Sequence, residues 1–276
     1  MENVNVNEKV SSNKERGQSF AKVVNERLGE TRINNQGEVM FIVEYVNSQD
    51  VTVQFKRTGE VVKCAYGTFV KGKVKSHFSA SVFGVGITGL EPTRDENGKM
   101  IDSYRCWCDM LMRCYSAKYQ EKHPSYKGCY VCNEWLYYHN FKKWYDENYY
   151  EIDGKTSQLD KDILVKNNKV YSPNTSMFVP NFINTLFVKR QNYRGELPIG
   201  VSYHKGNKKY VATLNLYKDG KSTRKTLAYY NTSNEAFEVY KRAKESYIKD
   251  VADEYKDIIP VELYKAMYEY EVDIND

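Results

Sequence analysis

The chain has 276 residues, 41% of them hydrophobic and 14% aromatic, which is enough apolar material for two or three small globular domains. Its apolar runs all fall short of the roughly eighteen residues of a membrane-spanning helix, and its polar first residues do not resemble a secretory signal. We therefore expect a cytoplasmic protein with no membrane partner.

The net charge of +5 conceals two oppositely charged segments. Residues 185–249 carry 14 Lys and Arg against 5 Asp and Glu, a net charge of +9. Residues 250–276 carry 2 against 9, a net charge of −7, and the residues before 185 are close to neutral. A basic segment followed by an acidic tail favours a protein that binds a polyanion over a metabolic enzyme, although many of these lysines would also suit an ordinary solvated surface.

The first part of the chain predicts a disordered start and a small β-barrel. Residues 1–16 have few hydrophobic side chains, so we expect them to be disordered. Residues 17–76 contain three strand-like segments separated by turn residues, and so small a sheet can cover its core by curling into a barrel. Residues 77–102, rich in Gly and turn residues, are expected to form a linker. The strand-like segments are 39–45, 51–55 and 61–69.

Residues 103–190 predict an α+β module that is rich in cysteine and aromatic residues. Tyr104, Trp107 and Leu111 recur at a spacing of three to four residues, which is typical of an amphipathic helix. A second helix is expected within 138–150. Aromatic side chains at helical spacing usually pack in a core, so we do not assign them a binding role.

Residues 191–255 predict a three-stranded antiparallel sheet followed by a helix. The last two strands are joined by an Asp-Gly pair at 219–220, which suits a tight hairpin. Thr232 and Glu235 form a capping box that opens the helix. Residues 256–276 are expected to be an acidic helical tail. The predicted fold class is therefore α+β.

The predicted sheet and helix resemble the DNA-binding domain of plant ethylene-response factors, which also occurs in phage homing endonucleases. In that family three antiparallel strands lie in the major groove and a helix packs behind them. Ala228 stands where the family usually has Gly. The matching positions are Gly200, Val201, 209–214, 227–230, Thr232, Glu235, Ala236, Tyr240 and Ala243.

This resemblance implies that six side chains face double-stranded DNA, of which only Arg224 keeps the charge that is usual in the family. Ser, Thr and Asn side chains can hydrogen-bond base edges or phosphates, and nearby lysines can attract phosphates whatever the sequence. The same sheet could instead be a protein-binding module. The six positions are Ser202, His204, Thr213, Asn215, Arg224 and Thr226, and the lysines are Lys205, Lys208, Lys209, Lys221 and Lys225.

The middle module resembles a phage HNH endonuclease family. The family pattern runs Trp, Met-x-x-Arg-Cys-Tyr, Val-Cys-x-x-Trp, Asn-Phe-x-x-Trp, Leu-Asp and Tyr-Ser-Pro-x-Asn. The resemblance implies a metal-dependent DNA endonuclease in which Asp160 and Asn174 bind Mg²⁺ or a similar divalent cation. The matching positions are Trp107, 110–115, 131–135, 140–144, Leu159, Asp160 and 171–174.

The chain departs from this family at Lys161, which follows Asp160 where the family has its catalytic histidine. HNH chemistry needs a neutral imidazole to deprotonate water, whereas an ordinary lysine is almost fully protonated at neutral pH. Lys161 could instead neutralise a phosphate oxygen. His139 could replace the missing base, although a histidine among aromatic residues is more often packed or solvated. We expect DNA binding to persist with weak or absent cleavage.

The cysteines present a second possible metal site. Cys129 and Cys132 form a Cys-x-x-Cys pair, but Cys106 and Cys108 would diverge by roughly 200° on a helix and could not share one zinc ion. Cys114 with Cys129 and Cys132 makes a better trio that lacks a fourth ligand. We favour reduced core thiols over a zinc site.

Two functions stay open. The first is a phage-type DNA-binding protein of the HNH homing-endonuclease kind, acting in the cytoplasm of the host cell. The second is a non-enzymatic phage protein that inhibits or regulates a host protein complex of anti-phage defence. The sequence does not determine the DNA target, the host partner or the oligomeric state.

Overall fold

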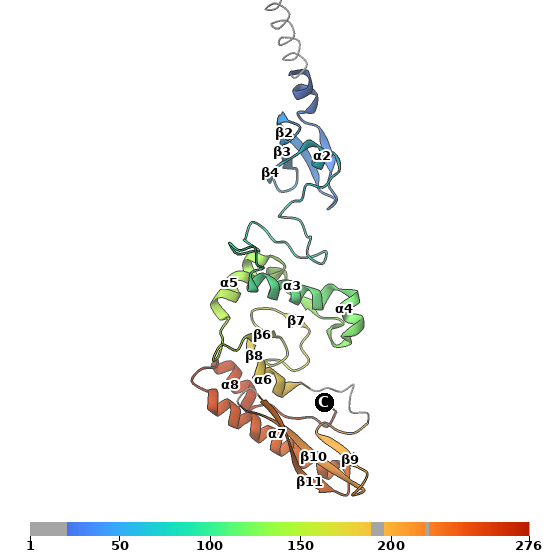
Figure 1. The fold of residues 1–276 in the computed structure, drawn as a ribbon, viewed down its shortest axis with the longest axis vertical. Helices are drawn as coiled ribbons and strands as arrows, with labels where there is room; N and C mark the ends of the chain where they lie inside the picture. The colour runs from blue at the N-terminus through green and yellow to red at the C-terminus, as the bar shows by residue number, and fades with distance from the viewer. Residues whose placement is uncertain (1–20, 189–195, 219–220, 276) are drawn as a thin grey trace, which may run out of the picture. The chain divides into compact units, whose positions relative to one another are not determined.

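The computed structural model describes residues 21–188, 196–218 and 221–275. They form the expected α+β fold (Figure 1). The chain divides into two compact units. The disorder predicted for residues 1–16 lies outside the described residues, and the predicted domain boundaries stay predictions. The first unit comprises Met1–Lys127 and Asn133–Lys142, and the second comprises Gly128–Cys132 and Lys143–Asp276.

A four-stranded antiparallel sheet, in the order β1-β2-β3-β4, forms the start of the first unit. Alternate residues of β2 and β3, such as Met40 and Val53, are buried against Phe69 of the short helix α2. Because α2 covers this apolar face, the sheet stays open, and the closed barrel that we predicted is not found among the described residues. The elements are β1 (Thr31–Ile33), β2 (Val39–Asn47), β3 (Asp50–Phe55), β4 (Val61–Cys64) and α2 (Tyr66–Val70).

The segment expected to be a linker packs against the helix that follows it. A side-chain carbon added at Gly86 would lie 2.5 Å from Leu111 and 2.8 Å from Trp107, so only glycine allows this backbone to approach the helix. The indole Nε1 of Trp107 donates to the carbonyl of Trp135 at 2.7 Å. Both predicted helices are confirmed. The elements are α3 (Asp102–Tyr115), α4 (Ala117–Lys122), η1 (Pro124–Tyr126), η2 (Asn133–Leu136) and α5 (Tyr138–Asn148).

The second unit begins with two short strand pairs. β6 and β8 are antiparallel, and β5 and β7 are parallel. The apolar side chains of β8 and α6, among them Val179 and Ile183, pack with the C-terminal helix α8. The elements are β5 (Tyr130–Val131), β6 (Ser157–Asp160), β7 (Val170–Tyr171), β8 (Met177–Pro180), α6 (Asn181–Asn184), η3 (Thr185–Phe187) and α8 (Val261–Tyr268).

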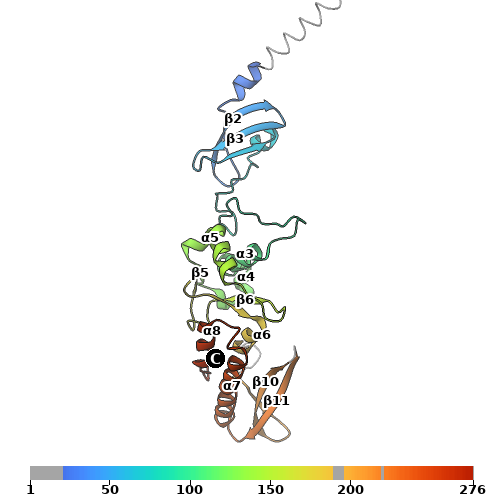
Figure 2. The same ribbon diagram turned by 90° about the vertical axis from the view of Figure 1, so that its left-hand side faces the viewer.

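The predicted three-stranded antiparallel sheet and its helix complete the second unit. β10 is the central strand, between β11 and β9, and α7 covers one face of the sheet (Figure 2). The capping box of Thr232 and Glu235 is present at the start of α7. The hairpin is confirmed by its register, although Asp219 and Gly220 lie outside the described residues. The elements are β9 (Val201–His204), β10 (Lys209–Lys218), β11 (Lys221–Tyr230) and α7 (Ser233–Tyr255).

Candidate nucleic-acid interface

The register of β10 and β11 places four of the predicted DNA-facing side chains on the face opposite α7. Thr213 pairs with Thr226, and Asn215 pairs with Arg224. Directly paired residues lie on the same face of a sheet, and successive residues alternate. Leu214, between Thr213 and Asn215, is buried against α7, so the four polar side chains point away from the helix.

Strand β9 adds the other two predicted residues to this face. Ser202 pairs with Val211 and His204 pairs with Lys209, and both partners lie an even number of residues from Thr213 on β10. The His204 ring lies 5.5 Å from the ring of Tyr229, centroid to centroid. We call these six residues the polar face: Ser202, His204, Thr213, Asn215, Arg224 and Thr226.

A β-bulge is what turns Arg224 and Thr226 outward. The register shifts between Ala212, which pairs with Ala228, and Thr213, which pairs with Thr226, so β11 has one extra residue at this point. A bulge of this kind reverses the alternation of the strand beyond it. Without the extra residue, Arg224 and Thr226 would point toward α7.

The same register separates the predicted lysines. Lys209 shares the side of the sheet that carries His204, and exposed Lys208 adopts a positive φ of 51° in the preceding turn. Lys225 pairs with buried Leu214, so it projects from the helix side of the edge strand β11. The Lys221 side chain lies outside the described residues. Lys225 is therefore not part of the polar face.

The polar face is free of negative charge. The three strands contain five Lys and Arg residues and no Asp or Glu. Arg224 is exposed, and its Nη2 donates a hydrogen bond to Oγ1 of Thr213 at 3.1 Å. A neutral hydroxyl orients the guanidinium without cancelling its charge, so this face can attract a phosphate group.

The predicted nuclease residues have structural contacts of their own. Asp160 lies at the end of β6, and its Oδ1 accepts hydrogen bonds from the backbone N–H groups of Asp162 at 2.7 Å and Ile163 at 2.8 Å. Burial raises the pKa of the Asp160 carboxyl, and these two backbone hydrogen bonds oppose the shift. The carboxylate thus holds the turn that follows the strand.

Lys161 closes the loop between β6 and β7. Its side chain is only about 5% exposed, and Nζ donates to Oδ2 of Asp162 and to the carbonyl of Asn168, each at 2.7 Å. The Asn168 amide donates in return to the Lys161 carbonyl at 2.8 Å. The Lys161 ammonium therefore forms its hydrogen bonds within the loop.

The Tyr-Ser-Pro segment forms a turn held by its own hydroxyl groups. Asn174 is exposed at this turn. The family's Tyr-Ser-Pro-x-Asn spacing, counted from Tyr171, reaches Thr175 and not Asn174. Thr175 Oγ1 donates to the carbonyl of Val170 at 2.8 Å and lies 2.8 Å from Oγ of Ser172. Asn174 therefore stands one position before the Asn of the family pattern, and Thr175 stands at that position.

His139 belongs to the first unit, whereas Asp160, Lys161 and Asn174 belong to the second. Its exposed ring contacts Oε1 of Glu91 through Nδ1 at 3.0 Å. Across residues 21–188, 196–218 and 221–275, no group of three or more His, Cys, Asp or Glu side chains is arranged to hold a metal ion. The divalent cation stays an expectation.

Two cysteines of α3, Cys106 and Cys108, lie in surroundings that disfavour the thiolate. Burial raises the pKa of Cys106 to about 12 and also raises that of Cys108. Cys106 and Cys108 are partly buried, and Cys114, Cys129 and their neighbour Cys132 are buried or partly buried. Thiols with raised pKa values are weaker metal ligands than thiolates, which supports the preference for core packing at Cys106 and Cys108.

One buried charged residue was not singled out from the sequence. Lys244 lies on α7 four residues after Tyr240 and four before Ile248, both of which are buried. The sequence could have revealed Lys244, because this spacing places it on the apolar stripe of an amphipathic helix.

No known protein family, curated protein or solved structure matches the chain significantly. Within the described part of the chain, no helix is both long and apolar enough to cross a membrane.

Proposed function

We propose that this chain binds double-stranded DNA through the polar face of its three-stranded sheet. The observation that carries the proposal is that six side chains chosen from the sequence share one face, opposite α7, on strands that contain no acidic residue. A twisted antiparallel sheet is one of the elements that proteins place in a DNA groove.

The charge of the segment supports the same partner. Residues 185–249 carry a net charge of +9, and Arg224 and Lys208 are exposed. Each basic side chain that contacts a phosphate releases condensed counterions, so affinity for the duplex should fall steeply with salt. Thr, Ser and Asn side chains beside these cations can hydrogen-bond phosphates or base edges.

We propose further that the protein is of the phage HNH homing-endonuclease kind and has a degenerate nuclease site. Two observations support this loss. The Lys161 ammonium is bonded within its loop, and Thr175 occupies the position of the family's Asn. If cleavage occurs at all, Asp160 and Asn174 would hold the divalent cation. A positioned general base contributes about 10² to 10⁴-fold, so its absence leaves at most slow nicking.

The test combines two assays on the full chain. A gel-shift titration of a random-sequence duplex at several salt concentrations measures binding, and incubation with supercoiled plasmid and Mg²⁺ or Mn²⁺ measures nicking. We expect a steep decline of log affinity with log salt and little or no nicking. Rapid nicking that survives Asp160→Ala would place the catalytic site elsewhere, and absence of duplex binding at low salt would overturn the proposal.

A second candidate is a non-enzymatic protein that regulates or inhibits a host anti-phage defence complex. Two exposed tyrosines of the sheet favour it, because Tyr203 and Tyr229 are 47% and 42% exposed and tyrosine is enriched at protein interfaces. Tight binding to a host protein complex by a chain without measurable duplex affinity would support this function.

A further inference from the structure

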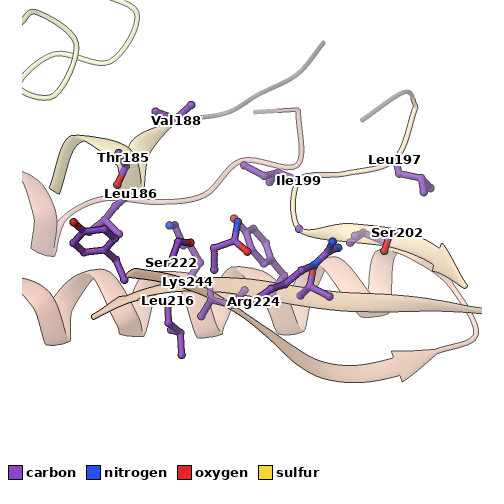
Figure 3. Close-up of a pocket in the computed structure, with 17 residues that line it drawn as sticks. Thr185, Leu186, Val188, Leu197, Ile199, Ser202, Leu216, Ser222, Arg224 and Lys244 are labelled. Atoms are coloured by element: carbon purple, nitrogen blue, oxygen red, sulfur yellow. The ribbon is translucent and has the colours of Figure 1, made fainter. Parts of the chain in front are cut away.

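A cavity of about 550 Å³ lies at the free edge of β10, beyond the point where β9 ends. β9 pairs with β10 only as far as Ala212. The described residues of the cavity wall come from β9, β10, β11 and α7 and from residues 185–188 and 197–200. Figure 3 shows the lining side chains, among them Lys244 from α7 and Arg224 from β11. Cavities of this size take small organic molecules.

Lys244 is the unusual member of this lining. Its residue is 9% exposed, and within the described part of the chain it has no hydrogen bond or ion pair. Burial lowers its pKa to about 8. An isolated buried ammonium is unfavourable unless an anion accompanies it, so this position would be more stable with an apolar side chain.

The remaining lining is suited to an anion with an apolar body. Arg224 lines the cavity from the polar face of the sheet, and none of the described lining residues is Asp or Glu. Ser202, Thr213 and Asn215 provide hydrogen-bonding groups, while much of the remaining wall is apolar, for example at Leu216.

We propose that this cavity binds a small organic phosphate, with the phosphate group beside Lys244 and the apolar body against the aliphatic wall. This site goes beyond the proposed DNA binding and does not depend on it. The phosphate could belong to a free small molecule or to a nucleotide of DNA, because Arg224 also belongs to the polar face.

The test is isothermal titration calorimetry of the full chain with phenyl phosphate, with phenol as the uncharged control. The two variants compared are Lys244→Met and Arg242→Met, which each remove one positive charge from α7. Arg242 is exposed, and two residues correspond to about 200° around the helix, so it points away from the buried stripe. Because Lys244→Met removes an unpaired buried charge, we expect this variant to fold. The thermal unfolding midpoint of each variant provides the check.

We expect wild type and Arg242→Met to bind phenyl phosphate equally and Lys244→Met to bind at least about tenfold more weakly, as loss of a charge-assisted hydrogen bond implies. Phenol should not bind measurably. Equal affinity in Lys244→Met, or no binding by wild type up to about 10 mM phenyl phosphate, would overturn the proposal.

Competition distinguishes the two sources of phosphate. If a short DNA duplex displaces phenyl phosphate, the natural occupant is a phosphate of DNA. If thymidine 5′-monophosphate displaces it and the duplex does not, the occupant is a free nucleotide or a similar small phosphate. Because the calorimetry with phenyl phosphate needs no DNA, failure of the DNA-binding proposal would leave this result unchanged.

Discussion

The guanidinium of Arg224 reaches across from β11 to Thr213 on β10, where its Nη2 donates to Oγ1 at 3.1 Å. This contact holds an exposed positive charge above the centre of the polar face. A cation fixed in this way loses less side-chain freedom on binding than a free lysine does.

We therefore predict that Arg224→Ala weakens duplex binding and lowers the salt slope by about one phosphate contact. The matched control is Arg242→Ala, which removes the same side chain from the exposed side of α7. Gel-shift titrations of both variants at several salt concentrations provide the measurement. Equal losses in the two variants would mean that overall charge, and not the polar face, determines binding.

Substitution of Gly200 tests how closely α7 packs against the sheet. Its φ is +77°, and an added side-chain carbon would overlap the ring of Tyr240. We predict that Gly200→Ala destabilises the protein by about 2 to 4 kcal/mol, from backbone strain and overpacking together. Gly206→Ala is the control, because the nearest atom to its new carbon is 3.3 Å away on the flexible His204 side chain. Urea unfolding of both variants provides the comparison.

The two buried lysines should respond in opposite directions to the same substitution. Lys161 has an acidic partner and a carbonyl partner, whereas Lys244 has neither within the described residues. We predict that Lys161→Met lowers the free energy of unfolding by about 1.5 to 3 kcal/mol, the usual worth of hydrogen bonds to a charged group. Lys244→Met should raise it. Urea unfolding at pH 7 measures both, and two changes of the same sign would contradict the assignment of partners.

The stabilisation by Lys244→Met should depend on pH. The folded-state pKa of Lys244 is lowered from 10.5 to about 8, so the folded protein binds fewer protons than the unfolded chain between these values. Wild-type stability therefore rises with pH across this window. The advantage of the Met variant is largest below pH 8, at most about 3 kcal/mol, and shrinks toward pH 10.5. The difference between the two unfolding curves at each pH cancels the other titrating groups.

Local signals predicted the three-stranded sheet of the second unit and the helix that covers it. The alternation in β10 and the Thr232–Glu235 capping box depend on residues close together in sequence, so they could be read directly. The prediction of a barrel was wrong because it relied on local composition alone. The segment 61–69 was expected to be one strand because Val, Tyr, Thr and Phe recur in it, but the strand ends at Cys64 and residues 66–70 form α2, whose Phe69 is buried against the sheet.

The site was less predictable because it depends on pairing between distant residues. The bulge opposite Thr213 decides that Arg224 faces outward and Lys225 does not, and no local pattern in β11 reveals it. From the sequence, Lys161 was expected to neutralise a phosphate oxygen in place of a catalytic histidine, but its Nζ donates to the Asn168 carbonyl, which comes into reach only in the folded loop. A family pattern identifies positions and does not report their contacts.

Helix α7 belongs to two hydrophobic cores. Its first half, at Ala236 and Tyr240, packs on the three-stranded sheet, and its second half, at Ile248 and Ala252, packs with β8, α6 and α8. A fragment of residues 198–249 would end inside the second core and leave Ile248 without most of its partners. Transplanting the sheet into another protein would therefore require grafting the helix with both of its packing surfaces. A recombination junction that preserves both cores must lie before Gly128 or beyond α8, so the sheet can be exchanged only together with the rest of the second unit.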